Sequence, residues 1–157
     1  MPPLEALGWK LLYHPDFFGS QYERLIAEAE RLRRSLPDAA FKQHPTARLV
    51  FAVAHVVNDI VPANPNHRDF LLRGALAKFR RVKGHGLPER FRLFFVFSST
   101  AKAVIYLYLN DERSLRQQGG RNDPYAIFQR LVRRHEIGDD FQANLARWLA
   151  ANRTGGG

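Results

Sequence analysis

The chain has 157 residues, of which 45% are hydrophobic, so it can bury a core as one folded domain. It contains no cysteine, which excludes disulfides, thiolate zinc sites and a cysteine nucleophile. Its 24 Lys and Arg against 15 Asp and Glu give a formal charge of +9, which favours a polyanionic partner such as nucleic acid or an acidic protein. We expect a cytoplasmic protein that does not enter a membrane. No apolar run approaches the roughly 20 residues that span a bilayer, and the N-terminus does not have the pattern of a signal peptide.

The first expected elements are a strand and a helix. Apolar side chains alternate over Trp9–Tyr13, which predicts a short strand. Ser20 followed by Glu23 fits a capping box at the start of a helix, and Pro37 ends that helix. Its apolar positions recur on one face, as in a helix that packs on a sheet.

A second helix and three strands follow. Proline suits the first turn of a helix, so the second helix begins near Pro45, and Pro62 ends it. Runs rich in Phe, Tyr, Val and Leu then occupy residues 78–83, 90–97 and 103–110, separated by turns. These runs predict the three strands of an antiparallel meander.

Two more helices are expected near the end of the chain. Asp123 followed by Pro124 predicts an N-cap and a first turn, and a last helix begins near Asp139. This order indicates an α+β domain over residues 1–153, in which the two long helices pack on one face of the sheet and the other face is left for function. The tail, residues 154–157, is expected to be disordered.

The most unusual feature is the placement of cations in the first two strands of the meander. Arg81 and Lys83 are two residues apart and share a face in a strand, and Arg90 and Arg92 do the same on the next strand. Pairing as a hairpin would bring the four cations into one patch. Like charges on adjacent strands repel by roughly a few tenths of a kcal/mol or more per opposed pair, so the patch calls for an anionic partner.

Two interpretations of this patch are open. In the structural one, cations on an edge strand block aggregation and nearby carboxylates balance them, namely Glu89, Asp111 and Glu112. In the functional one, the patch is a groove for RNA phosphates, with Tyr125 or Phe79 available for stacking on bases.

The sequence offers no recognisable cofactor or metal site. Gly84-His85-Gly86 lacks the further residues of a phosphate-binding loop. His55 and Asp59 could share a helix face, but two ligands do not make a metal site. We therefore expect neither a cofactor nor a metal.

Five segments, in chain order, carry a family resemblance: Gly8-Trp9-Lys10-Leu11 before His14-Pro15, Ile60-Val61-Pro62-Ala63-Asn64-Pro65, Phe91-Arg92-Leu93-Phe94-Phe95, Leu109-Asn110-Asp111-Glu112, and Asp123-Pro124-Tyr125-Ala126-Ile127-Phe128. On these segments the chain resembles the YhaV family of toxins from bacterial toxin–antitoxin systems, within the wider RelE/ParE-type superfamily. The similarity extends over residues 8–148.

This resemblance implies a RelE-like fold and a ribonuclease that cuts mRNA, free or on the ribosome, in the bacterial cytoplasm. It also implies a partner antitoxin of the PrlF type that silences the toxin. RelE-like toxins carry basic residues two apart on the strand before an aromatic-Arg-Leu strand, which correspond here to Arg81 and Lys83, then Arg92. The loop between the strands is longer here, so the register is open and Arg80 could take the place of Arg81. A further Arg and Tyr that act in RelE-like enzymes correspond to Tyr125 and to one of three arginines: Arg113, Arg116 or Arg121.

The expected mechanism is metal-independent attack of the substrate's own 2′-hydroxyl on the adjacent phosphate. Arg81 and Arg92 suit the crowded phosphorane, because a guanidinium grips phosphate with two parallel hydrogen bonds. His85, the only histidine in the basic hairpin, is a candidate base or acid, and Lys83 or Glu112 could be the base instead. Further cations are expected to bind RNA: Lys78, Arg80, Arg90, Arg113, Arg116 and Arg121.

Three alternatives stay open. A toxin of the same fold could bind a protein target such as DNA gyrase, or a non-enzymatic module could bind RNA phosphate without chemistry. The basic patch could also mainly hold an acidic antitoxin segment. A 2′,3′-cyclic phosphate end on the product would distinguish a nuclease from the first two.

Overall fold

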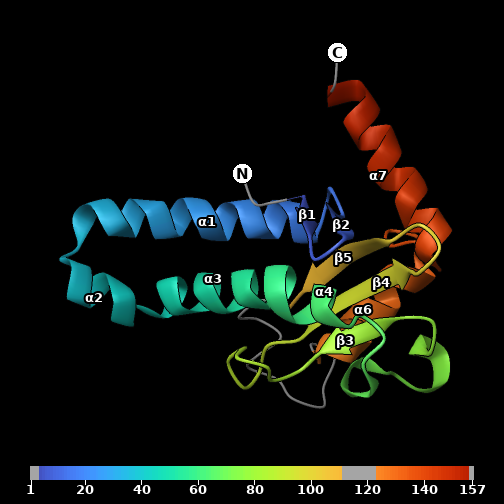
Figure 1. The fold of residues 1–157 in the computed structure, drawn as a ribbon, viewed down its shortest axis with the longest axis horizontal. Coiled ribbons are helices and arrows are strands. Elements are labelled where there is room, and N and C mark those ends of the chain that lie inside the picture. The colour runs from blue at the N-terminus through green and yellow to red at the C-terminus, as the bar shows by residue number, and fades with distance from the viewer. Residues whose placement is uncertain (1–3, 111–122, 156–157) are drawn as a thin grey trace.

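The computed structural model describes residues 4–110 and 123–155, and its centre is a five-stranded sheet of order β1-β2-β5-β4-β3 (Figure 1). The strands are β1 Glu5–Ala6, β2 Trp9–Tyr13, β3 Arg80–Val82, β4 Leu93–Ser98 and β5 Ala103–Leu109. β3, β4 and β5 form an antiparallel meander, and β2 joins β5 in parallel. The expected N-terminal strand, the meander and the α+β class are confirmed.

The four expected helices are present with somewhat different ends, and the structure adds a short helix that the sequence does not predict. They are α1 Phe18–Ser35, α2 Asp38–Gln43, α3 Pro45–His55, the π-helical turn η1 Val56–Ile60, α4 Val61–Ala63, α6 Pro124–Arg133 and α7 Phe141–Gly155, with the 3-10 turns η2 Arg68–Phe70 and η3 Gly74–Leu76. The capping box predicted at Ser20 is wrong, because α1 begins at Phe18 and no side chain caps it. The sequence does not predict α2, whose six residues are too few to show an apolar period.

α3, η1 and α4 form one helical stretch, Pro45–Ala63, that lies against the sheet. By length and composition this 19-residue stretch would also suit a membrane span, so the expectation that no segment approaches that length is wrong. Here four of its valine side chains are buried in the core between the helices and the sheet: Val53, Val56, Val57 and Val61. At the widened π-turn, the buried hydroxyl of Tyr106 in β5 donates to the carbonyl of Val57 at 2.8 Å, which gives that carbonyl a partner.

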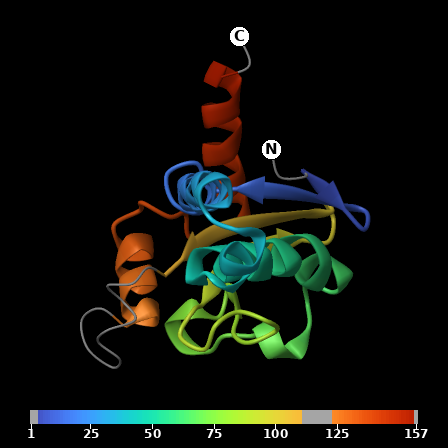
Figure 2. The same cartoon turned by 90° about the vertical axis from the view of Figure 1, so that its left-hand side faces the viewer.

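Helices cover both faces of the sheet. On one face, α1 and α3 lie side by side and extend past the strands, with α2 at their far end (Figure 1). On the other face, α6 and α7 pack on the strands, and Phe128 of α6 stacks on Phe94 of β4 with ring centroids 4.2 Å apart. Figure 2, which looks along α1 and α3, shows α6 beside this helix pair and α7 behind it.

The expectation that the second face stays open is therefore wrong. Every residue of β5 is buried, and a strand that is apolar on both faces needs cover on both. α7 extends to Gly155, two residues into the segment for which the sequence predicts disorder.

The β3–β4 hairpin is shorter than the sequence predicts. β3 has three residues, and its register pairs Arg81 with Phe94. Lys83 follows β3, while Arg90 and Arg92 precede β4. The predicted patch of four cations on paired strands is therefore wrong. Two glycines in the connecting loop adopt positive φ and a proline there lacks an N–H donor, so the ladder cannot continue.

Candidate active site

Arg81 lies in β3 with its side chain on the face that α6 covers. Its Nη1 donates to the hydroxyl oxygen of Tyr125 at 3.1 Å, and its Nη2 donates to the backbone carbonyl of Asp69 at 3.1 Å. Its Nε is buried and has no hydrogen-bond partner among the described residues. The two hydrogen bonds fix the guanidinium in place, while its Nε, like that of Arg80, has no partner among the described residues.

Arg92 lies one residue before β4 and reaches the same hydroxyl. Its Nε donates to the oxygen of Tyr125 at 3.2 Å. Its Nη1 donates to the backbone carbonyls of Glu89 at 2.7 Å and Phe91 at 2.9 Å, which fix the guanidinium over its own loop. Arg81 and Arg92 therefore meet at one oxygen atom, although they are not cross-strand partners in the ladder.

The start of α6 positions Tyr125. Asp123 caps the helix as the sequence predicts, and its Oδ1 accepts from the N–H groups of Tyr125 at 2.9 Å and Ala126 at 3.4 Å. The ring of Tyr125 stands edge-on to Phe94, with centroids 5.6 Å apart and an interplanar angle of 86°. Because the phenolic oxygen accepts from both arginines, its own hydrogen is left to donate to a third group.

Sequence reasoning missed Asn110, which fixes the backbone around Arg92. The residue is 1% exposed. Its Oδ1 accepts from the N–H of Arg92 at 2.5 Å, its Nδ2 donates to the carbonyl of Arg90 at 2.9 Å, and its own N–H donates to the carbonyl of Arg92 at 3.4 Å. These bonds hold Arg92 beside the end of β5. In the sequence, Asn110 directly follows a buried strand, as in many ordinary turns, and it belongs to one of the five segments that carry the family resemblance.

Among the described residues, no carboxylate forms an ion pair with Arg81 or Arg92. Glu89, one of the predicted counter-charges, contacts Arg92 through its backbone carbonyl. The other two, Asp111 and Glu112, lie outside the described residues. Two guanidinium groups beside one hydroxyl donor make a site that suits a phosphate group.

Arg80, the alternative to Arg81, has its side chain on the opposite face of β3. Its guanidinium carbon lies 5.5 Å from the ring centroid of Phe97, and its Nη1 donates to backbone carbonyls of the preceding segment. The register therefore selects Arg81, and not Arg80, as the neighbour of Arg92 and Tyr125.

His85 contacts Asp69 and Phe70 and bonds neither Arg92 nor Tyr125 among the described residues, although Asp69 is also the residue whose carbonyl accepts from Arg81. Its Nε2 is 3.4 Å from Oδ2 of Asp69, and its ring centroid is 5.4 Å from that of Phe70. Phe70 belongs to the core under α1 and α3. His85 therefore lies toward the face of the sheet opposite Tyr125.

The remaining predicted site residues fall into two groups. Lys78, Lys83 and Arg90 are exposed around the hairpin. The others lie outside the described residues: Glu112, Arg113, Arg116 and Arg121. Within residues 4–110 and 123–155, no group of three or more His, Asp or Glu side chains could hold a metal ion.

Comparison with known families shows what kind of protein carries this site. A family described as "Toxin with endonuclease activity, of toxin-antitoxin system" matches residues 12–148. The chain belongs to this YhaV toxin family. "Toxin YhaV" of Escherichia coli O6:H1 is 31% identical over 147 residues, which cover 90% of this chain and 92% of that protein. "Ribonuclease toxin YhaV" of Escherichia coli K12 is 33% identical over 138 residues, which cover 84% of this chain and 86% of that protein.

No solved structure matches the chain. The resemblance read from the sequence is confirmed, and the part that matches the YhaV family includes Arg81, Arg92, Asn110 and Tyr125. In this YhaV-family toxin, the guanidinium groups of Arg81 and Arg92 meet at the hydroxyl of Tyr125, within the part of the chain that matches a family of endonuclease toxins.

Proposed function

We propose that this YhaV-family toxin is a ribonuclease that cleaves mRNA at the site formed by Arg81, Arg92 and Tyr125. The observation that carries the proposal is the convergence of two guanidinium groups, without carboxylate partners among the described residues, on one hydroxyl. Membership in a family of endonuclease toxins supports it, as does the printed name of the K12 relative, a ribonuclease toxin.

A toxin of a toxin–antitoxin system implies a cognate antitoxin. We propose that this antitoxin is of the PrlF type and that the toxin acts in the bacterial cytoplasm, on free mRNA or on mRNA bound to the ribosome. The sheet with α1 and α3 on one face supports a RelE-type fold.

The proposed reaction uses no metal. The 2′-oxygen of one nucleotide bonds to the adjacent phosphorus while the bond from phosphorus to the 5′-oxygen of the next nucleotide breaks, which leaves a 2′,3′-cyclic phosphate and a 5′-hydroxyl. A base takes the proton of the 2′-hydroxyl, and an acid gives a proton to the leaving 5′-oxygen. Charge builds on the non-bridging oxygens in between, so donors already fixed at that point lower the barrier most.

The residues take their roles from the geometry. Arg81 and Arg92 donate to the non-bridging oxygens. Tyr125 keeps its hydroxyl hydrogen available and donates it to the same phosphate or to the leaving oxygen. Lys83, Glu112 and His85 remain the candidates for base or acid. Nε2 of His85 lies 3.4 Å from Oδ2 of Asp69, the residue whose backbone carbonyl accepts from Arg81.

One experiment tests the proposal. Purified wild-type toxin and Arg92→Ala are incubated with a defined single-stranded RNA, free and on translating ribosomes, with and without EDTA, and the product ends are mapped. We expect cyclic phosphate ends, no effect of EDTA, and a rate about 100- to 1,000-fold lower for Arg92→Ala. Intact RNA in both settings would overturn the ribonuclease function. A folded, fully active Arg92→Ala would overturn the site, and inhibition by EDTA would overturn metal independence.

A further inference from the structure

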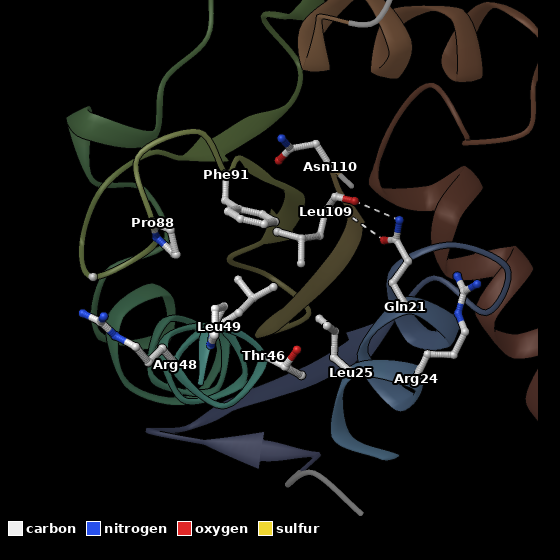
Figure 3. Close-up of a pocket in the computed structure, with 12 residues that line it drawn as sticks. Gln21, Arg24, Leu25, Thr46, Arg48, Leu49, Pro88, Phe91, Leu109 and Asn110 are labelled. Carbon is white, nitrogen blue, oxygen red and sulfur yellow. Dashed lines mark hydrogen bonds between the residues drawn. The ribbon is translucent and has the colours of Figure 1, made fainter. Parts of the chain in front are cut away.

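A pocket of about 830 Å³ opens between α1, α3 and the loop before β4, on the face of the sheet opposite Tyr125 (Figure 3). Its wall is largely apolar and includes Leu25, Leu49, Phe91 and Leu109, which Figure 3 shows gathered around the cavity. Leu25, Leu49 and Phe91 are only partly buried, so this apolar surface is open to solvent.

Two cations stand on opposite sides of the opening, Arg24 from α1 and Arg48 from α3 (Figure 3). Both are exposed, and neither forms an ion pair with any described residue. Glu28, one turn after Arg24 on α1, pairs instead with Arg31 through two hydrogen bonds of 3.0 and 2.5 Å. The pocket therefore combines an apolar wall with two positive charges that the described residues leave uncompensated.

The two carboxamide side chains on the wall are already engaged. The amide of Gln21 donates to the carbonyl of Leu109 at 2.8 Å and accepts from its N–H at 3.0 Å (Figure 3). The amide of Asn110 bonds the backbone of Arg90 and Arg92. A nucleobase is recognised through hydrogen bonds to its edges, and these amides are not free to provide them. The pocket suits an apolar side chain flanked by carboxylates better than it suits RNA.

We propose that the cognate antitoxin inserts a segment with an apolar side chain between acidic residues into this pocket. The apolar side chain would cover Leu25 and Leu49, and the acidic flanks would pair with Arg24 and Arg48. An acidic segment also matches the formal charge of +9 on the toxin. The inference rests on the antitoxin part of the proposed function and not on its cleavage chemistry.

This pocket shares residues with the support of the active site. Phe91 directly precedes Arg92, and Asn110 bonds the backbone of Arg92. An antitoxin segment bound here therefore touches the groups that hold Arg92 in place, although it does not occupy the phosphate site itself.

Binding of the purified cognate antitoxin, measured by calorimetric titration without RNA, tests the proposal. Arg24→Glu combined with Arg48→Glu should raise the Kd by at least about tenfold at low salt. Arg33→Glu combined with Arg34→Glu changes the charge equally at exposed positions in the last turn of α1, and should leave the Kd nearly unchanged. Leu49→Gln probes the apolar wall and should weaken binding even at high salt. Circular dichroism and thermal melting confirm that each variant folds.

RNA cleavage by the free variants is measured in parallel and should match wild type for both pairs of arginine variants. Equal antitoxin affinity in the two pairs would overturn the proposal. Loss of RNA cleavage in the Arg24 and Arg48 pair, with antitoxin affinity intact, would assign the pocket to RNA and also overturn it. If the toxin proves not to cleave RNA, the titration still measures antitoxin binding, because it contains no RNA and does not depend on cleavage.

Discussion

Arg92 donates from Nε to the hydroxyl oxygen of Tyr125 at 3.2 Å, although 33 positions separate the two residues in the chain. Arg81 donates to the same oxygen at 3.1 Å, so this oxygen sets the spacing of two guanidinium groups before any anion binds. Donors that are in place beforehand stabilise a charged transition state without reorganisation at the moment of reaction. The relationship therefore places Tyr125 at the centre of the proposed catalysis.

Tyr125→Phe removes the shared acceptor while the ring can keep its edge-on contact with Phe94. We expect RNA cleavage to slow by about 100-fold, because the two guanidinium groups lose their common anchor and the phosphate loses a donor. The free energy of unfolding should change by no more than about 1 kcal/mol. Single-turnover cleavage and urea unfolding measure the two quantities. Wild-type cleavage by a folded variant would show that the hydroxyl is not part of the site.

Arg81→Ala and Arg80→Ala form a matched pair, since the residues are adjacent in β3 and point to opposite faces. Arg81→Ala should lower the cleavage rate by about 100-fold or more. Arg80→Ala should leave the rate nearly unchanged, and should lower the free energy of unfolding by about 0.5–1 kcal/mol through its lost contact with Phe97. Equal losses of activity in the two variants would mean that the register does not select between these arginines.

The regular elements could be predicted because their apolar periods are local. Trp9–Tyr13 alternates at period two, and Pro45 marks the start of α3, so both elements were expected. The parallel pairing of Leu12 with Ile105 could not be predicted, because no local pattern names a partner so distant in the chain. The uniformly apolar sequence of β5 does carry a signal for cover on both sheet faces, because a strand with one face in water alternates apolar and polar residues.

The residues of the candidate site were easier to predict than their arrangement. Arg81, Arg92 and Tyr125 were all expected, but the shared hydroxyl depends on how α6 packs on the sheet, and no short motif specifies that. The sequence also predicts His85 at this site, where its backbone has a positive φ of 54° and its Nε2 lies 3.4 Å from Oδ2 of Asp69. A positive φ at a non-glycine loop residue is uncommon and cannot be predicted from residue types alone.

Asn110 is predicted to be a positioning residue for Arg92. Asn110→Ala leaves the N–H of Arg92 and the carbonyl of Arg90 without their side-chain partners, each at a cost of about 1–3 kcal/mol where the group stays buried. The displaced guanidinium should lower kcat by about 10- to 100-fold with little change in KM. Asn110→Asp keeps the acceptor for Arg92 and should recover part of the activity. A loss of stability with unchanged kcat in the folded fraction would reduce Asn110 to a structural role.

We predict that the buried side chain of His14 makes the stability of the toxin depend on pH. The residue is 1% exposed at the end of β2, its Nδ1 accepts from the N–H of Asp16 at 3.2 Å, and its Nε2 lies 3.1 Å from the carbonyl of Glu136. Burial lowers the pKa of His14 below the ordinary value of 6.5, and the positive charge of Arg147 adds a smaller effect in the same direction. Asp16 and the carbonyl of Glu136 oppose the shift in part.

The unfolded chain therefore binds the proton of His14 more readily than the folded chain does. The contribution of His14 to the free energy of unfolding should be at its full value above pH 6.5. It should fall as the pH drops from 6.5 toward the lowered pKa of His14 in the folded state. The slope contributed by one such group is at most about 1.4 kcal/mol per pH unit. Urea unfolding of wild type and His14→Asn at pH 8 and pH 5.5 measures it. His14→Asn should be less stable at pH 8 but should lose less stability on acidification. Equal losses in the two proteins would show that His14 titrates alike in the folded and unfolded chains.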